Sequence, residues 1–213
     1  MAEYSGVPHT EVDLILVNGE SVDFGFQISD GDDISVYPVF ESFAIVGVTR
    51  LQERPLRRLQ FVADANLRKL TRRMRLLGFD VAFDKRATKN DIIQTMKNEN
   101  RVILSVERRL LMRKEVQRGY YIRSDDSNLQ ALEVIRRFDL VDLINPFTRC
   151  VSCNALVKPV DKAEVLEHLE PKTKKFYDAF TQCPQCQKIY WEGFHTERLE
   201  AFFDWIKREL ADC

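Results

Sequence analysis

The sequence predicts an α/β protein: a parallel sheet flanked by helices, with a short antiparallel segment before it and a metal-binding module after it. Three observations support this prediction. Strand-like and helix-like segments alternate from Leu59 onward, which is typical of a parallel sheet. The dipeptide Asn18-Gly19 joins two hydrophobic runs near the start of the chain, as in a β-hairpin. Two Cys-x-x-Cys pairs occur in the last third of the chain.

The first part of the chain is predicted to form a β-hairpin and a further strand. Hydrophobic side chains alternate along Val12–Val17, Asn18-Gly19 supplies the favoured two-residue turn, and the strand returns along Val22–Phe26. Another strand is expected at Ile34–Phe40. Within it, Pro38 marks an edge or an end, because proline has no amide hydrogen to donate to a neighbouring strand.

The middle of the chain alternates between short hydrophobic runs, which predict buried strands, and helix-like segments. Gln60–Ala63 is the first run, and the helix after it ends at Gly78 with hydrophobic residues at Leu67, Leu70, Met74 and Leu77. The other faces of this helix are expected to carry Arg68, Lys69, Arg72, Arg73 and Arg75. Further strands are expected at Phe79–Phe83, Val102–Ser105 and Tyr120–Ile122. Further helices are expected at Lys89–Asn98, at Ser127–Phe138 and at Glu197–Leu210. One more helix is expected to follow the strand Val102–Ser105 and to end at Gln117. The expected domains are residues 1–50, a linker at 51–58, residues 59–145 and residues 146–213.

Charge is strongly partitioned along a chain whose net charge is only −1. Residues 57–123 carry 18 Lys and Arg against 7 Asp and Glu, a net charge of +11, whereas residues 1–56 carry −8 and residues 124–213 carry −4. A basic block inside a near-neutral protein is typical of a nucleic-acid-binding surface, and a solvated charged face is the alternative. The sequence shows no export signal and no hydrophobic segment of membrane-spanning length. A cytoplasmic protein without a membrane partner is therefore expected, with its five cysteines as metal ligands or free thiols.

Carboxylates follow several of the predicted strands. Asp64 comes after the first strand, Glu107 follows the run that ends at Val106, and Asp125 and Asp126 follow Tyr120–Ile122. The carboxyl ends of parallel strands form the ligand crevice of an open sheet, so acids gathered there in a basic field predict a divalent cation and a polyanion. Such a carboxylate can instead cap the next helix, and this alternative applies most strongly to the Asp125-Asp126 pair.

The two cysteine pairs, Cys150–Cys153 and Cys183–Cys186, are separated by 29 residues. Tetrahedral Zn²⁺ takes four thiolates, and each pair presents two of them on one tight turn. The insert Asp161–Phe180 is expected to be helical and to loop out between the pairs. A closed set of four cysteines leaves no open coordination position, so the zinc is predicted to be structural. Four unrelated thiols, or two disulfides, are the alternatives.

Five segments of the chain form a further pattern in combination: Phe61–Leu67 (FVADANL), Arg75–Asp80 (RLLGFD), Arg123–Asp126 (RSDD), Pro146–Asn154 (PFTRCVSCN) and Ile189–His195 (IYWEGFH). Together they resemble the Mut-seven C-terminal ribonuclease family, a PIN-like nuclease domain fused to a zinc ribbon. The segment from Gly6 through Glu41 is similar to the ubiquitin-like β-grasp domain that often precedes it.

The resemblance implies a PIN-like parallel sheet flanked by helices, a partial β-grasp segment before it and a Cys₄ zinc ribbon after it. It also implies cleavage of single-stranded RNA by three or four carboxylates around one or two Mg²⁺ or Mn²⁺ ions, which prefer hard oxygen ligands. Carried onto this sequence, the catalytic carboxylates are Asp64, Asp91, Glu107 and either Asp125 or Asp126. A role for Asp91 at its helix N-terminus is the alternative to metal binding. The basic residues expected to contact RNA are Arg68, Lys69, Arg72, Arg73, Arg108 and Arg123.

Three departures from the family pattern bear on function. The family's Thr-Arg-Asp-Arg is Ser105-Val-Glu-Arg here, so Glu107 adds a methylene, and a ~1 Å displacement at a catalytic position can cost about 100-fold in rate. Arg68 stands where a small residue is usual, and it can crowd the site or contact phosphate. The β-grasp segment starts at what would be the end of its helix. Either the chain start is truncated, or the strands pair with a protein partner or a second copy, since an unpaired strand edge is a liability.

The sequence therefore predicts a metal-dependent endoribonuclease, a PIN-type phosphodiester hydrolase that acts on single-stranded or structured RNA. The alternative is a non-catalytic RNA- or ribonucleoprotein-binding module with a degenerate site, which the change at Glu107 favours and the retention of Asp64 and Asp91 opposes. A third possibility is a protein-interaction adaptor that acts through the acidic N-terminal segment. That segment is also hypothesised to fold over the basic surface and restrain RNA binding.

Overall fold

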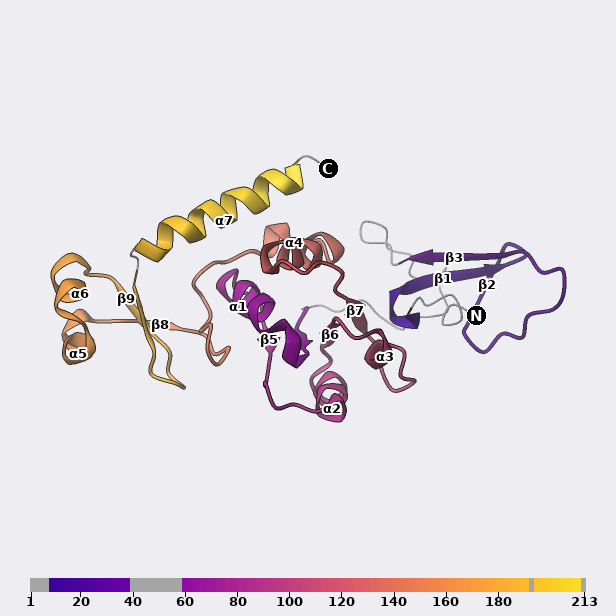
Figure 1. The fold of residues 1–213 in the computed structure, drawn as a ribbon, viewed down its shortest axis with the longest axis horizontal. Helices are drawn as coiled ribbons and strands as arrows, with labels where there is room; N and C mark the ends of the chain where they lie inside the picture. Colours follow the sequence, from indigo (N-terminus) through magenta and orange to yellow (C-terminus); the bar gives the residue numbers. More distant parts are fainter. Residues whose placement is uncertain (1–7, 39–58, 192–193, 212–213) are drawn as a thin grey trace. The chain divides into compact units, whose positions relative to one another are not determined.

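The computed structural model describes residues 8–38, 59–191 and 194–211, and within them the chain is a mixed α/β protein (Figure 1). It divides into two compact units. The first holds the N-terminal strands and most of the parallel sheet, and the second holds helices α1 and α4 and the chain from Leu140 onward. The predicted linker at 51–58 lies outside the described residues. Among the described helices, none is both long and apolar enough to cross a membrane.

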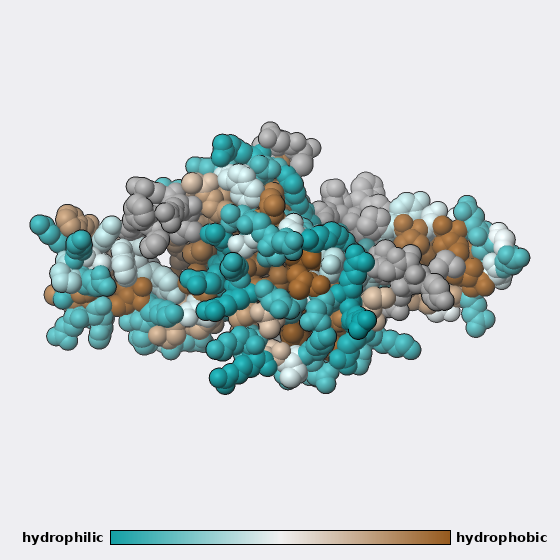
Figure 2. Space-filling model, viewed as in Figure 1, coloured by the Kyte–Doolittle hydropathy of each residue, from teal (hydrophilic) through white to brown (hydrophobic). Residues whose placement is uncertain are grey.

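The N-terminal strands form an antiparallel sheet in the order β2–β1–β3. A 3-10 helix η2 (His9–Glu11) leads into β1 (Val12–Val17), which is followed by β2 (Glu20–Val22) and β3 (Ile34–Pro38). Asn18 and Gly19 have φ values of 53° and 84°, the left-handed conformation that a two-residue hairpin turn requires, so the predicted hairpin is confirmed. Figure 2 shows apolar side chains over this sheet, and on β3 the side chains of Val36 and Tyr37 are 45% and 37% exposed.

The returning strand is shorter than predicted. The expectation of a strand along Val22–Phe26 is wrong, because β2 begins directly after the turn and ends at Val22. Asp23 then closes a local turn: its Oδ1 atom accepts a hydrogen bond from the amide of Gly25, and its carbonyl accepts one from the amide of Phe26. Aspartate favours such side-chain turns, which compete with strand pairing.

The central sheet has four strands in the order β5–β4–β6–β7. These strands are β4 (Phe61–Ala63), β5 (Val81–Ala82), β6 (Val102–Ser105) and β7 (Gly119–Tyr121), and the 3-10 helix η3 (Ala65–Leu67) follows β4. The pairs β4–β6 and β6–β7 are parallel, as the alternation of strands and helices predicted. Strands β4 and β6 are buried along their whole length, which explains why they appear in the sequence as continuous hydrophobic runs.

Helices α2 (Lys89–Glu99) and α3 (Arg108–Leu111) belong to the same unit as β4, β6 and β7. Their buried side chains form one core with strand residues: Val62, Ile92, Ile93, Met96, Ile103, Leu110, Leu111 and Val116. The expectation that the second of these helices reaches Gln117 is wrong. The helix ends at Leu111, and β7 begins at Gly119, where an added Cβ would lie 2.6 Å from the Leu111 side chain.

The second unit contains α1 (Arg68–Leu76) from Lys69 onward, α4 (Ser127–Arg137) up to Arg136, and the C-terminal module. In that module β8 (Lys158–Val160), β9 (Phe180–Gln182) and β10 (Ile189–Trp191) form an antiparallel sheet in the order β10–β9–β8. Its remaining helices are η4 (Val141–Leu143), α5 (Lys162–Val165), η5 (Leu166–His168), α6 (Pro171–Phe176) and α7 (Phe194–Ala211). The expected helical insert Asp161–Phe180 is thus broken, since Pro171 can start a helix but not continue one, and Phe180 lies on β9.

Gly78 terminates α1 as predicted, and its backbone conformation has two consequences. Its φ of +96° lies in the left-handed region that side chains rarely adopt. An added Cβ would also lie 2.2 Å from the carbonyl oxygen of Asn145, so the two backbones touch at this point. Glycine is therefore required here for space as well as for conformation.

We expect Gly78→Ala to lower the free energy of unfolding by at least about 2 kcal/mol, because strain and overlap act together. The matched control is Gly19→Ala, which has a φ of +84° and open space around its Cβ position. Strain alone should cost the control about 1 kcal/mol. Urea denaturation of both variants measures the difference, and equal losses would show that the contact with Asn145 does not constrain the fold.

Candidate functional site

Asp64 lies directly after β4 and is the most buried of the predicted catalytic carboxylates, with only 4% of its surface exposed. Its Oδ1 atom accepts a hydrogen bond from the amide of Asn66 (2.8 Å). Its Oδ2 atom accepts bonds from the hydroxyl of Ser105 (2.5 Å) and the amide of Val106 (3.0 Å). A carboxylate has about four acceptor directions, so these three donors fix its orientation and leave about one direction open.

Ser105 connects the two predicted metal ligands that follow neighbouring strands. It is fully buried at the end of β6, and its hydroxyl donates to Asp64 while accepting a bond from the amide of Glu107 (2.9 Å). The Glu107 carboxylate forms an ion pair with the Nζ atom of Lys89, at 2.5 Å, and both side chains are substantially exposed. The role of Ser105 was not predicted from the sequence, in which its position two residues before Glu107 is the available signal.

Two of the other predicted acids cap helices. Asp91 completes a capping box at the start of α2: its Oδ2 atom accepts bonds from the amide and the hydroxyl of Thr88, which lower the pKa of this exposed carboxyl. Asp126 accepts bonds from the amides of Leu129 and Asn128 at the start of α4, and these lower its pKa. The capping alternative is therefore observed at both positions. Asp125 is exposed.

The predicted RNA-contacting residues are mostly solvent-accessible. Arg68, Lys69 and Arg72 are exposed on α1, whereas Arg73 is half-buried with its guanidinium 5.0 Å from the centre of the Phe202 ring. Arg108 is exposed and lies 4.8 Å from the centre of the Tyr121 ring. Such cation–π contacts orient an arginine without neutralising its charge.

Arg123, just after β7, is held by aromatic rings and by an acid from the N-terminal segment. Its guanidinium lies 5.3 Å and 5.6 Å from the ring centres of Tyr120 and Tyr121. Its Nη2 atom donates to Glu11 (2.5 Å), a carboxylate that is 8% exposed and also accepts a bond from the amide of Tyr121 (3.0 Å). Nothing in the local sequence around Glu11 indicates this contact, because its partners lie more than a hundred residues away.

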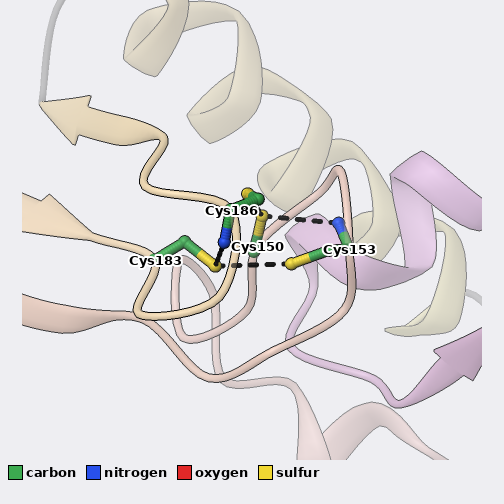
Figure 3. A group of neighbouring side chains, drawn as sticks. All are labelled: Cys150, Cys153, Cys183 and Cys186. Atoms are coloured by element: carbon green, nitrogen blue, oxygen red, sulfur yellow. Dashed lines mark hydrogen bonds between the residues drawn. The ribbon is translucent and has the colours of Figure 1, made fainter.

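The four cysteines form a compact cluster in which their side chains turn toward a common centre (Figure 3). All four Sγ atoms lie within 4.8 Å of one another, with 3.4 Å between Cys150 and Cys186 and 3.3 Å between Cys153 and Cys183. Those distances are too long for disulfides. Tetrahedral Zn²⁺ with bonds of 2.3 Å would place its sulfurs about 3.8 Å apart, so the cluster fits this ion. Among the described residues, it is the one group of three or more His, Cys, Asp or Glu side chains close enough to hold a metal.

The surroundings of the cluster favour a thiolate at Cys150. Burial raises the pKa of this thiol, but hydrogen bonds from the Tyr190 hydroxyl and from nearby backbone amides outweigh it and lower the pKa to about 6. Burial raises the pKa of Cys153 to about 12. Metal ligation requires thiolates, so zinc binding at this site releases protons, and zinc affinity falls as the pH is lowered.

The expectation that Arg75 lies on an open face of α1 is wrong. Only 3% of its surface is exposed, and together with Thr71 it extends the buried stripe of Leu70 and Met74. Its guanidinium donates to the carbonyl oxygens of Val81, Val151 and Ser152. Burial lowers the pKa of Arg75, although the neighbouring cysteine thiolates oppose that effect, and an arginine remains charged in a protein.

Comparison with known families gives two matches. Residues 59–203 match the Mut7-C RNAse domain, and residues 1–44 match the Mut7-C ubiquitin domain. No curated protein and no solved structure matches the chain. The first match covers more than half of the chain and includes Asp64, Glu107 and all four cysteines of the cluster.

We expect the purified protein to contain one zinc ion per chain, measured by inductively coupled plasma mass spectrometry. Cys153→Ser should reduce zinc to well below one equivalent, because three thiolates no longer close the tetrahedron. Cys213→Ser is the matched control, since Cys213 belongs to neither Cys-x-x-Cys pair, and it should retain full zinc. Zinc retained equally by both variants would contradict the four-cysteine site.

Proposed function

Because the chain belongs to the Mut7-C RNAse domain family, we propose that it is a metal-dependent endoribonuclease that cleaves single-stranded or structured RNA. The catalytic domain is a PIN-like fold at residues 59–145. The observation that carries the proposal is the buried Asp64 carboxylate, which is oriented by three donors and keeps an acceptor direction open. The bond from Asn66 caps η3, whereas the bonds from Ser105 and Val106 come from the end of the neighbouring strand, which capping alone does not require.

The parallel register supports a site at the carboxyl edge of the sheet. Ala63 pairs with Leu104, and Ser105 pairs with Tyr121, so the chain leaves three adjacent strands at one edge. Asp64, Glu107 and Arg123 follow these strands within a few residues. This edge is where open α/β sheets bind ligands, and it brings acidic and basic side chains to one end of the sheet.

Asp64, Asp91 and Glu107 are the proposed ligands of Mg²⁺ or Mn²⁺, with Asp125 or Asp126 as a further acid. Among the described residues these carboxylates do not form a group close enough to hold one ion, so their side chains would have to move to bind it. A bound ion of this type activates a water and stabilises charge on the phosphoryl oxygens. Asp64 would contribute its open acceptor direction, and Ser105 would hold its orientation through the bond to Oδ2. Glu107 would exchange its exposed ion pair with Lys89 for the metal.

RNA binding is proposed to depend on the exposed basic residues of α1 together with the arginines near β7. The α1 residues are Arg68, Lys69 and Arg72, with Arg73 beside them, and the others are Arg108 and Arg123. Contacts of this kind go to phosphates and carry little base specificity. A substrate preference for single strands or accessible loops would then come from the shape of the site rather than from sequence.

The remaining parts of the chain have supporting roles in this proposal. Residues 146–213 form a zinc ribbon whose Zn²⁺ is structural, because four thiolates close the coordination sphere. Residues 1–50 are proposed to be a ubiquitin-like β-grasp segment whose outer strands bind a protein partner or a second copy. The exposed apolar side chains of β3 support such an interaction, since accessible hydrophobic surface often marks a binding site.

A non-catalytic RNA- or ribonucleoprotein-binding module is the second candidate. Two observations favour it: Glu107 is paired with Lys89, and Asp91 and Asp126 already serve as helix caps. In this alternative the carboxylates stabilise the fold, and the basic residues alone account for RNA binding. Cleavage and binding assays on the same variants separate the two functions.

We expect cleavage of a panel of single-stranded RNAs in Mg²⁺ or Mn²⁺, and Asp64→Asn should reduce the rate at least about 100-fold by weakening metal binding. Asp84→Asn, which changes an exposed loop aspartate, is the matched control and should cleave at the wild-type rate. Gel-based kinetics measure cleavage, and thermal unfolding checks that both variants fold. If wild type binds RNA but does not cleave it with either ion, the non-catalytic module is the correct function.

A second expectation concerns the salt dependence of RNA binding. Replacing Arg72 by Gln should reduce the slope of log K against log salt by about 0.7, the value for one lost phosphate contact on a single strand. Arg109, an exposed arginine of α3 outside the proposed surface, provides the control Arg109→Gln. Fluorescence anisotropy across a salt series gives both slopes, and indistinguishable slopes would remove Arg72 from the RNA-binding surface.

A further inference from the structure

Arg75 makes contacts that neither RNA binding nor metal catalysis explains. It is buried in α1, and within the part of the chain that the structure describes its guanidinium donates hydrogen bonds to backbone carbonyls. Nε and Nη2 donate to Val81 (3.0 and 2.7 Å), and Nη1 donates to Val151 (3.2 Å) and Ser152 (2.9 Å). One side chain thus joins the helix, the start of β5 and a distant loop.

The distant loop is the first cysteine turn. Val151 and Ser152 are the two residues between Cys150 and Cys153, so Arg75 binds the backbone of the turn that presents two of the four sulfurs. Within this turn the amide of Cys153 points at the sulfur of Cys150, 3.5 Å away. Fixing the two carbonyls therefore fixes the peptide planes that hold both sulfurs in place.

Further contacts join the same two segments. The side chain of Asn154 accepts a bond from the amide of Val81 (3.1 Å) and donates to Asp80 (2.7 Å). Arg149 pairs with Asp80 (3.2 Å) and donates to the carbonyls of Gly78 (3.2 Å) and Asn154 (2.8 Å). Side chains of residues 75–81 thus bond to the segment 149–154, and side chains of that segment bond back to residues 75–81. Both segments belong to one compact unit.

A charge argument adds to the geometry. Four thiolates around Zn²⁺ carry a net charge of −2, and two of them belong to the buried residues Cys150 and Cys183, so a nearby cation stabilises the centre. The Arg75 guanidinium contacts the turn that holds Cys150 and Cys153. It can therefore stabilise the loaded centre as well as position its ligands.

We propose that Arg75 couples zinc binding at the four-cysteine cluster to the docking of the segment from α1 to β5. Bound zinc then holds the C-terminal end of α1 in place. Because linkage is reciprocal, the docked helix also raises the affinity of the cluster for zinc. The inference rests on the zinc assignment of the proposed function and is independent of nuclease activity. Arg75 acts here as a positioning residue and not as a metal ligand.

The first test compares zinc affinity in variants of the full chain, by competition with a chromophoric chelator. Arg75→Met should weaken zinc binding about 10- to 100-fold, the usual effect of removing a group that orients metal ligands. Arg75→Lys keeps the charge but cannot reach all three carbonyls, so it should recover only part of the loss. Arg109→Met is the matched control on an exposed arginine and should bind zinc like wild type.

The second test needs no variant and therefore does not depend on whether Arg75→Met folds. Hydrogen–deuterium exchange is measured on wild type with Zn²⁺ bound and after removal by a strong chelator. Peptides that cover residues 75–83 should lose protection together with those that cover 149–154. Retained protection at 75–83 after zinc removal, or unchanged zinc affinity in Arg75→Met, would overturn the coupling. A wild-type protein that binds no zinc would instead remove the zinc assignment itself.

Discussion

The parallel pairing of β4 with β6 is the constraint on which the candidate site depends. Each strand has only three or four residues, and both are buried along their length, so the register between them is strongly specified. This register places Asp64 beside Ser105, residues that are 41 positions apart in the sequence, and leaves both at the same edge of the sheet. The geometry at Asp64 follows from these few backbone hydrogen bonds, and the backbone of Glu107 is held in turn by the bond from its amide to Ser105.

Much of the fold was predictable because its signals are local. The Asn18-Gly19 turn, the capped helix α2 and the buried strands β4 and β6 are each encoded within a few residues. One error arose where the sequence carries no local stop signal: α3 ends at Leu111, although the next glycine or proline is Gly119. The cysteine cluster was predictable from spacing, because two residues between cysteines fix a tight turn wherever the pairs lie in the chain.

The carboxylates show why site residues are harder to predict than elements. A helix cap and a metal ligand require the same residue type at the same place, directly after a strand and before a helix. Sequence alone therefore left Asp91 and Asp126 open, and the structure reveals capping bonds at both. Asp64 caps the 3-10 helix η3 as well, but it differs because it also accepts bonds from Ser105, at the end of the neighbouring strand, and from Val106 just after it. Arg75 was misplaced for a related reason: its three carbonyl partners lie outside its own helix, and periodicity does not report such partners.

The ion pair between Lys89 and Glu107 can be weighed against metal binding on physical grounds. Both side chains are about half exposed, and such surface pairs contribute only about 0–1 kcal/mol. A divalent cation shared with Asp64 would attract the Glu107 carboxylate more strongly than Lys89 does, because the charge of the cation is doubled. The weak pair therefore leaves Glu107 available. For metal binding, the added methylene of Glu107 is a larger obstacle than its ion pair with Lys89. Ligand geometry around Mg²⁺ is strict, whereas an exposed ion pair is easily exchanged.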